Sequence, residues 1–536
     1  MLDSPMRYSL NSSLLAVGAG AVLVGALPAK AQSIHSVKVI ERVLESLRDS
    51  KGLPLDARKS AREIMSYYAA ADSRTLWIGN RRGERLIEAL TALQRDGLFN
   101  SQRSVKRLQT MRQAMRSLDS SFLALGEIVH SAHFYELASD LRLGQMRLYR
   151  ARLHPRTLAR KISAKALLDR VLEGIPLVQV LEDIQPQEKE YQAIKKRLAE
   201  LLSLRSRGGW VPVRPGSPLR IGMSHDRVKD IRARLAAGGE LADANQSSKV
   251  YDKALAAAVR LFQRRHNLRP SGTLNRSTVL AMNVPWRQRV QQLQVNLERW
   301  RWFGDVPSNN RWIINTAAKR LFWRRRATIQ KNLRITINRS CQVQAAFNTV
   351  ARRIVANPKY NLSKREALRY VLPVLKSNPS KLDTSFAIYG KAPASQAPRI
   401  NWRNYNEADF PFSVIQQPGP SNPLGSFQIY FDEIDSVSLH GLPTVRAFPK
   451  IRQACVGVPE KTLNLADLLP VYGFAQPSLA AQPSQSGNPL EIRLKSPISV
   501  VFIYATIWVG RDGEVVFGAD PLGRDAKLGR LILRRI

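Results

Sequence analysis

Apolar and polar residues follow three successive patterns along this chain. Between about residues 36 and 204, apolar residues recur at three- and four-residue spacing, as at Ile87 and Leu90, and glycine and proline are sparse. That spacing predicts a helical domain, to which we assign residues 32–205. The apolar run Leu76-Trp77-Ile78 lies between the helices, and we expect it to pack in the core.

A glycine- and proline-rich link at residues 208–216 separates this domain from a compact module, because both residue types favour turns. We assign the module to residues 206–287 and expect three short helices in it. The residues that mark these helices are Val228, Ile231 and Leu235 in the first, Leu255, Val259 and Phe262 in the second, and Thr278 to Met282 in the third.

Strand-like patterns dominate the rest of the chain, which we treat as one domain at residues 288–536. An aromatic-rich helix at residues 293–302 opens it and is interpreted as docking the module to the strand-rich part of the chain. Short apolar runs then predict strands, at residues 312–316, 321–323, 333–337, 426–431, 436–440, 498–509 and 515–517. An insertion at about 357–411, with a helix at 364–376 and looser chain after it, interrupts them. The predicted fold class is multidomain: an α-helical N-terminal domain, a three-helix module, and a mostly β domain with a helical insertion.

Residues 1–31 have the pattern of a secretory signal peptide. Arg7 gives a positive start, residues 14–27 are apolar, and Ala29-Lys30-Ala31 fits the small-x-small cleavage rule. An uncleaved anchor is the alternative, but the apolar stretch is short for a bilayer span of about 20 residues. No later segment is apolar enough to span a membrane. We therefore expect an exported protein of the periplasm or cell envelope, without a transmembrane segment after cleavage.

The formal net charge of +41 predicts a polyanionic partner. The leader holds Arg7, Lys30 and Asp3, a net of +1, so the mature chain keeps +40. Nucleic acid is not expected, because the chain is predicted to be exported and has no zinc-finger, aromatic RNA-binding or basic-zipper pattern. An anionic polymer of the envelope fits an exported protein better. A general basic bias without a specific partner is the alternative.

Cys455 and His440 form the candidate catalytic pair. The chain has only 2 cysteines and 7 histidines, and these two residues are 15 positions apart. An imidazole can take the thiol proton and hold the thiolate. His440 is expected where a strand enters a loop. Basic residues at 446, 450 and 452, and a helix expected at 461–469, favour a reactive thiolate.

Two other interpretations of Cys455 stay open. A lone cysteine is usually a small buried hydrophobe, and Cys455 could instead form a disulfide with Cys341 in an oxidising compartment. The scattered histidines show no metal-ligand spacing. We expect neither a metal nor an organic cofactor.

The three-helix module resembles the peptidoglycan-binding domain of many wall enzymes. The resemblance is carried by Tyr251, Asp252, the run Ala256-Ala257-Ala258-Val259, Phe262, Gln263, His266, Leu268 and Gly272. It implies peptidoglycan as a partner and assigns Tyr251, Phe262 and Gln263 to the binding module. His266 is expected to be structural. Asn275 stands where the family often has a second glycine.

Nearly the whole mature chain resembles the L,D-transpeptidases with a YkuD-type catalytic domain, and most closely their YcbB-like branch. The matching segments are Leu76-Trp77, Glu298-Arg299-Trp300-Arg301-Trp302, Asn357-Pro358, Gly419-Pro420-Ser421-Asn422-Pro423-Leu424-Gly425, Leu439-His440 with Pro443, Tyr504-Ala505-Thr506, Asp512-Gly513 and Asp520.

This resemblance implies a reaction and roles for its residues. The Cys455 thiolate attacks the third residue, a diamino acid, of a tetrapeptide stem, releases D-alanine, and forms a thioester. An amine of a second stem then opens the thioester to give a 3→3 peptidoglycan cross-link. His440 is the expected general acid and base, and backbone groups at Ala454, Gly441 and Gly425 are expected at the oxyanion and substrate. Other wall-synthesis enzymes could also be partners.

The residues around Cys455 depart from the family's pattern. The family usually has Ser-x-Gly-Cys, where this chain has Arg452-Gln453-Ala454-Cys455, and Gly457 replaces an arginine or asparagine. Two functions therefore stay open. One is an active transpeptidase with altered preference for its stems, and the other is a diverged peptidoglycan-binding protein with weak or no turnover.

Overall fold

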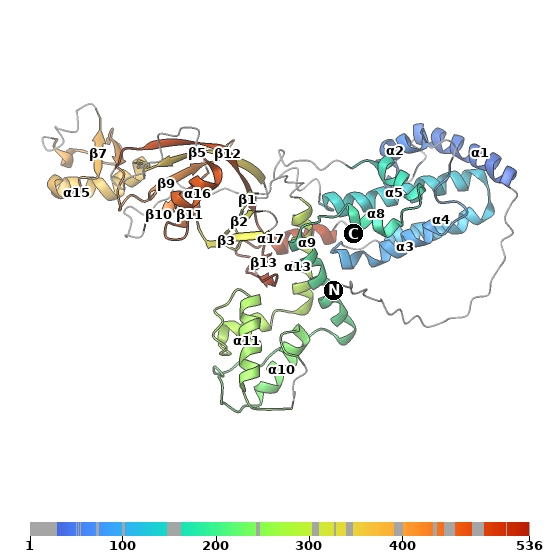
Figure 1. The fold of residues 1–536 in the computed structure, drawn as a ribbon, viewed down its shortest axis with the longest axis horizontal. Helices are drawn as coiled ribbons and strands as arrows, with labels where there is room; N and C mark the ends of the chain where they lie inside the picture. The colour runs from blue at the N-terminus through green and yellow to red at the C-terminus, as the bar shows by residue number, and fades with distance from the viewer. Residues whose placement is uncertain are drawn as a thin grey trace, which may run out of the picture.

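The computed structural model describes most of the chain after the predicted leader. The described residues are 29–49, 51, 53, 55–70, 74–98, 102–146, 162–242, 247–302, 310–325, 328–338, 347–390, 400–432, 437–443, 456–473, 487–510 and 512–534. Both cysteines, Ala454, and nearly all of the predicted leader lie outside these ranges. The molecule is elongated, with the helical domain at one end, the β domain at the other, and the small module projecting between them (Figure 1).

The N-terminal domain is helical, as its periodicity predicts. Its elements are α1 (Ala29–Arg48), α2 (Leu55–Tyr68), α3 (Arg82–Ala92), η2 (Leu93–Asp96), α4 (Gln102–Ala114), η3 (Met115–Ser117), α5 (Ser120–Leu143), α7 (Ala164–Leu172), α8 (Leu177–Asp183), α9 (Lys189–Ser203) and η4 (Leu204–Arg207). The Leu76-Trp77 run is in the core, where Glu127 of α5 accepts the backbone N–H groups of Leu76 and Trp77. The buried carboxylate thus supplies the hydrogen-bond acceptors that these amides would otherwise have in regular secondary structure.

The module contains the three expected helices, α10 (Arg227–Gly238), α11 (Lys253–Arg265) and α12 (Arg276–Met282). Asp252 caps α11 by accepting the N–H of Leu255. Asn275 caps α12 in the same way with Thr278, and Asn and Asp are favoured at this position because the side-chain oxygen pairs an amide that has no partner in the helix. The departure from glycine at position 275 therefore has a structural reason.

The C-terminal domain is built on a mixed sheet. Its strands are β1 (Asn310–Asn315), β2 (Arg320–Arg325), β3 (Thr328–Arg334), β4 (Thr336–Ile337), β5 (Phe347–Ala356), β9 (Phe427–Tyr430), β10 (Ser438–Leu442), β11 (Val456–Pro459) and β12 (Leu490–Ile503). Within the described chain the order is β3-β2-β1-β12-β5-β9-β10-β11-β4. The β1–β12 and β10–β11 pairs are parallel. β13 (Ile507–Val509) pairs with β14 (Val515–Phe517), and helices α16 (Leu465–Tyr472) and α17 (Arg524–Arg534) complete the domain.

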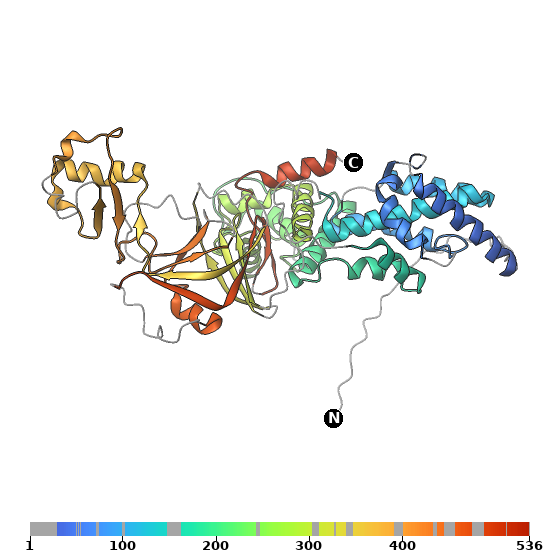
Figure 2. The same cartoon turned by 90° about the horizontal axis from the view of Figure 1, so that it is seen from above.

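The insertion forms a subdomain with its own core (Figure 2). It contains β6 (Tyr360–Asn361), α14 (Lys364–Glu366), the π-helical turn η5 (Ala367–Val371), α15 (Leu372–Ser377), η6 (Pro379–Lys381), β7 (Phe386–Tyr389), η8 (Trp402–Asn404) and β8 (Ser413–Gln416). Among the described residues, β6, β8 and β7 form a separate sheet in that order. The looser chain expected after the helix therefore contains β7, and β8 lies just after the predicted end of the insertion at about residue 411.

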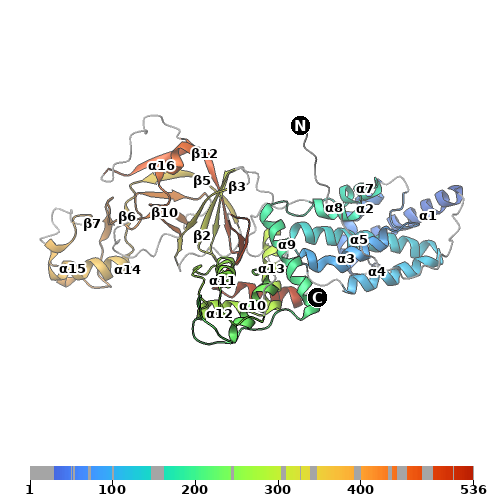
Figure 3. The ribbon, with the colours of Figure 1, turned by 60° about the horizontal axis from the view of Figure 1, so that its bottom comes forward.

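Helix α13 (Trp286–Arg301) lies where the parts of the molecule meet (Figure 3). Its Leu293 and Leu297 share one core with Tyr191 of α9 and with strand residues of the β domain. Burying this apolar surface is the main term that holds the parts together. The observed architecture confirms the predicted fold class of a helical N-terminal region, a helical module and a mostly β C-terminal domain.

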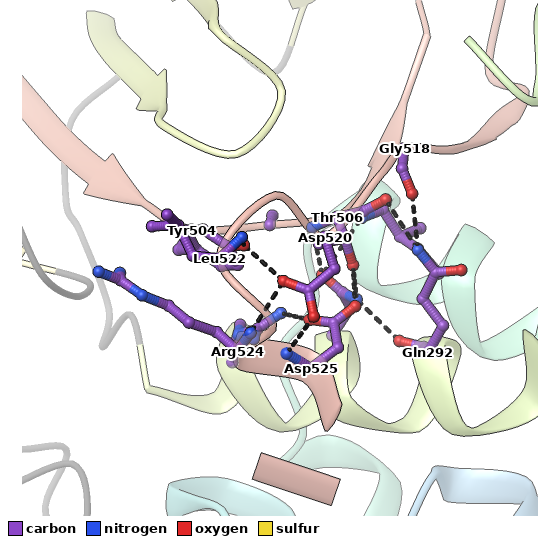
Figure 4. A network of polar contacts seen from close by, with 12 residues as sticks. Gln292, Tyr504, Thr506, Gly518, Asp520, Leu522, Arg524 and Asp525 are labelled. Carbon is purple, nitrogen blue, oxygen red and sulfur yellow. Dashed lines mark hydrogen bonds and ion pairs between the residues drawn. The ribbon is translucent and has the colours of Figure 1, made fainter. Parts of the chain in front are cut away.

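A polar network fixes the end of β12 to helices α13 and α17 (Figure 4). Asp525 accepts from Thr506 Oγ1 and from Arg299 Nη1, both at 2.5 Å. Gln292 of α13 donates to the carbonyl of Gly518 at 2.9 Å. Thr506, part of a matching segment in the sequence, thus anchors secondary structure.

In the described part of the chain, no helix is long and apolar enough to cross a bilayer.

Candidate active site

His440 is the central residue of β10, and its side chain is buried with 3% exposed. The expectation that it ends a strand was wrong, because β10 continues to Leu442. Nδ1 of His440 lies 2.7 Å from the carbonyl oxygen of Gly441. Burial lowers the pKa of His440 to about 4, and hydrogen bonds with the carbonyls of Gly441 and Pro423 oppose that shift. The imidazole is therefore neutral at pH 7.

The register of two parallel strands relates His440 to the chain around the cysteine. Leu439 of β10 pairs with Val456 of β11, and His440 pairs with Gly457. Val456, the first residue of β11, directly follows Cys455 in the sequence. Cys455 and Ala454 themselves lie outside the described residues, as do the basic residues at 446, 450 and 452.

Gly425 and Gly441 are brought together beside the buried histidine. Gly425 has a φ of +65°, and a Cβ on it would lie 2.8 Å from the carbonyl oxygen of Gly441. A Cβ on Gly441 would lie 2.5 Å from Glu460 Oε1. Glycine is required at position 425, because its φ is positive and the backbone of Gly441 is too close for a Cβ, whereas a Cβ at position 441 would have to displace the Glu460 side chain.

Glu460 is the residue at this site that sequence reasoning missed. Its Oε1 accepts the backbone N–H of Ser426, and its own N–H donates to the carbonyl of Leu442. It therefore ties the end of β11 to the end of β10 and to the residue before β9. An acid after a valine-proline pair carries no distinctive spacing, so only the fold reveals its position.

The segment at 419–425 is held by the buried side chain of Asn422. Its Nδ2 donates to the carbonyls of Pro358 and Gln417, at 2.9 and 3.1 Å, and its Oδ1 accepts the N–H of Leu424. These bonds fix the turn that carries Pro423, whose carbonyl interacts with the imidazole of His440. The asparagine in the Gly-Pro-x-Asn-x-Leu-Gly pattern thus orients the histidine indirectly.

The helix expected to stabilise the thiolate starts too late in the chain to support that argument. α16 begins at Leu465, and strand β11 and a turn separate it from Cys455. The field of a helix N-terminus falls off within about one turn. The argument from closeness along the sequence is therefore wrong.

Gly457 occupies a position with no room for a larger residue. A Cβ there would lie 2.6 Å from Thr336 Oγ1 and 2.8 Å from Leu442 Cδ2. A larger residue at position 457 would have to displace the side chains of Thr336 and Leu442. The neighbouring side chains are thus matched to glycine.

The motif residues of the small module are core residues. Tyr251, Phe262 and Gln263 are fully buried. The Tyr251 hydroxyl donates to the carbonyl of Gly272, and Gln263 donates to Thr278 Oγ1 and accepts the N–H of Gly272. These residues build the core of the binding module. None of their side chains reaches the surface, so they cannot contact a ligand there.

Exposed apolar residues of the module lie elsewhere. Ile221, Met223 and Val250 are 51%, 38% and 48% exposed, and backbone hydrogen bonds between Tyr251 and residues 222 and 223 bring them side by side. These side chains, unlike those of the motif residues, are open to solvent.

His266 has the structural role expected from the sequence. Its ring stacks on Phe262 at 3.8 Å and on Phe517 of β14 at 5.3 Å. The adjacent Arg265 pairs with Glu514 at 2.7 Å. The module is therefore seated on the β domain.

Among the residues with described positions, no group of His, Cys, Asp and Glu is arranged to hold a metal.

Comparison with known proteins identifies two parts of the chain. Residues 62–198 match the family model described as "Scaffold domain", and residues 224–282 match the model of a "Putative peptidoglycan binding domain". None of the curated proteins matches the chain. Among solved structures, an L,D-transpeptidase from Xylanimonas cellulosilytica is similar over 46% of this chain and 90% of that chain, at 12% identity and a TM-score of 0.14. The module match supports peptidoglycan as a partner and a role at the cell wall.

Proposed function

We propose that this chain is a periplasmic L,D-transpeptidase that forms 3→3 peptidoglycan cross-links through a thioester on Cys455. The observation that carries the proposal is the register of β10 and β11. It pairs His440 with Gly457, two residues after Cys455. Neighbouring strands are about 4.8 Å apart, so Val456, the residue that follows the cysteine in the sequence, lies beside the histidine's strand.

His440 is neutral at pH 7, which is the protonation state from which a general base starts. Its imidazole accepts the thiol proton as Sγ bonds to the stem's carbonyl carbon. The carbon–nitrogen bond to D-alanine then breaks, and the imidazolium gives its proton to the leaving amine. A second stem's amine attacks the thioester, and its proton returns by the same histidine to the thiolate. Backbone N–H groups at Ala454 and Cys455 would stabilise the oxyanion.

A second candidate function is peptidoglycan binding with little or no turnover. Gly457 favours it, because a glycine at this position offers no side chain to anchor a substrate carboxylate. The match at residues 224–282 is consistent with both functions.

One experiment separates the two. Purified mature protein is incubated with a disaccharide-tetrapeptide, and cross-linked dimers and free D-alanine are measured, with Cys455→Ala as the control. The transpeptidase proposal predicts both products for the wild type and neither for the variant. Binding to isolated sacculi without products supports the second candidate. A mass measurement without reductant tests for a bond between Cys341 and Cys455, which would block the nucleophile.

A further inference from the structure

The insertion subdomain contains a cavity that plays no part in the cysteine chemistry. Its volume is about 140 Å³, and it lies between η6, β7, β8 and the helix that includes Val374. An apolar cavity of about 150 Å³ is large enough to hold benzene. Alanine has the same number of non-hydrogen atoms as benzene, so a small amino acid fits this space.

A buried amide gives the cavity an unused acceptor. Gln416 of β8 lines it and is 1% exposed. Its Nε2 donates to the carbonyl and the Oγ of Ser421, both at 3.4 Å. Its Oε1 has no hydrogen-bond partner among the described residues. A buried acceptor without a partner costs free energy unless water or a ligand supplies a donor.

Two opposite charges line the same cavity without pairing. Lys381 and Asp383 both contribute to the lining, and neither forms an ion pair in the described part of the protein. Asp383 uses Oδ1 to accept the N–H of Ser385 at 2.9 Å. A lysine and an aspartate that line one space without pairing match a ligand that carries both charges.

Val374, Leu382 and Phe386 give the cavity an apolar wall, and Tyr370 and Ser421 complete its lining. A space with an apolar wall, a few polar groups and separated charges is typical of a small-molecule site. We propose that this cavity binds an amino-acid zwitterion. The ammonium donates to Gln416 Oε1 and faces Asp383, the carboxylate pairs with Lys381, and a small side chain lies against the apolar wall.

Two sources carry this chemistry: a free amino acid of about alanine size, and the amino-acid head group of a diamino acid in a wall peptide. The site itself goes beyond the proposed function, since it needs no cysteine. Only the second source rests on that function.

The test is isothermal titration calorimetry of the mature protein with D-alanine, L-alanine, N-acetylalanine and alaninamide. We expect at least one alanine enantiomer to bind. Each capped analogue loses one charge-assisted contact and should bind at least about five-fold more weakly. Titration with meso-diaminopimelic acid and with a tripeptide stem that ends in it distinguishes a free amino acid from a wall peptide.

Variants link the binding to the cavity. Gln416→Leu, Lys381→Met and Asp383→Asn should each raise Kd at least about five-fold. Lys364→Met and Glu407→Gln, exposed positions of the same subdomain outside the lining, should leave it unchanged. Because Lys381 and Asp383 are on the surface, their variants remain informative if Gln416→Leu fails to fold.

Three results would overturn the proposal: no binding of either alanine or of diaminopimelic acid at millimolar concentration, equal binding of the capped analogues, or an unchanged Kd in the lining variants. The cavity would then hold water alone. Cys455→Ala should bind as the wild type does. Loss of cross-linking activity and loss of this site are therefore separate outcomes.

Discussion

Replacing Glu127 with leucine is expected to destabilise the helical domain strongly. Both carboxylate oxygens of this buried side chain are used. Oε1 accepts the backbone N–H groups of Trp77 and Ile78, at 2.7 and 3.1 Å. Oε2 accepts the N–H of Leu76 at 3.0 Å and the Tyr68 hydroxyl at 2.9 Å. One carboxylate therefore satisfies a stretch of backbone that belongs to no helix.

The magnitude follows from the donors left behind. Leucine removes the acceptor while the three amides stay in place, and each buried donor without a partner costs about 1–3 kcal/mol. Because such costs are not additive, we expect a loss of roughly 4 kcal/mol or more in the free energy of unfolding of this domain. Glu127→Gln keeps one acceptor oxygen but turns an NH₂ toward an amide, so its effect should be intermediate.

Urea denaturation gives the free energy, and hydrogen–deuterium exchange of the peptide spanning residues 76–78 localises the effect. Glu84→Gln is the matched control. Its carboxylate is 40% exposed and pairs with Arg81 and Arg112, and pairs of this kind contribute about 0–1 kcal/mol. If Glu127→Leu lowers the free energy of unfolding no more than Glu84→Gln does, and hydrogen–deuterium exchange at residues 76–78 is unchanged, the Glu127 carboxylate does not hold this segment.

Three further predictions concern the rest of the molecule. Gly441→Ala places a Cβ 2.5 Å from Glu460 Oε1 and should lower both melting temperature and cross-linking, at a stability cost of about 1–3 kcal/mol; a variant with wild-type activity contradicts it. Glu514→Gln removes a 2.7 Å pair with Arg265 and should cost under about 1 kcal/mol, measured by urea denaturation; a larger loss means that the pair dominates docking of the module. Acidification from pH 7 toward pH 4 should lower the free energy of unfolding by up to roughly 3 kcal/mol through His440. The reason is that the pKa of His440 in the folded protein, about 4, lies below its pKa in the unfolded chain, near 6.5. The unfolded state takes up the proton first, so His440→Gln should flatten the pH dependence of unfolding across this interval.

The long periodic segments could be predicted from the sequence, while two short strands of the insertion, β7 and β8, could not. The helices before residue 204 and in the module follow from apolar spacing over many residues. β7 and β8 have only four residues each, too few to show a period, and they exist because they pair with each other. β12 begins at Leu490, eight residues before the predicted start at 498, although the alternation of Leu490, Ile492 and Leu494 is visible in the sequence.

The candidate site could be predicted only in part. His440 and the two glycines follow from motifs in the sequence, and the fold places them together. Glu460 could not be found, because its role depends on a contact with Ser426 across 34 positions. Tyr251 and Gln263 show the opposite error. Residues that identify a module are often those that build its core, so a motif is no guide to which side chains touch a ligand.

The most direct test of the central claim is the intact mass of the mature protein after incubation with a carbapenem, followed by peptide mapping. The proposed mechanism predicts one covalent adduct, on the peptide that contains Cys455. The adduct should be absent from Cys455→Ala and should form more slowly in His440→Gln, because the histidine supplies the base. No adduct on a folded protein that still binds sacculi would contradict the transpeptidase proposal and leave wall binding as its function.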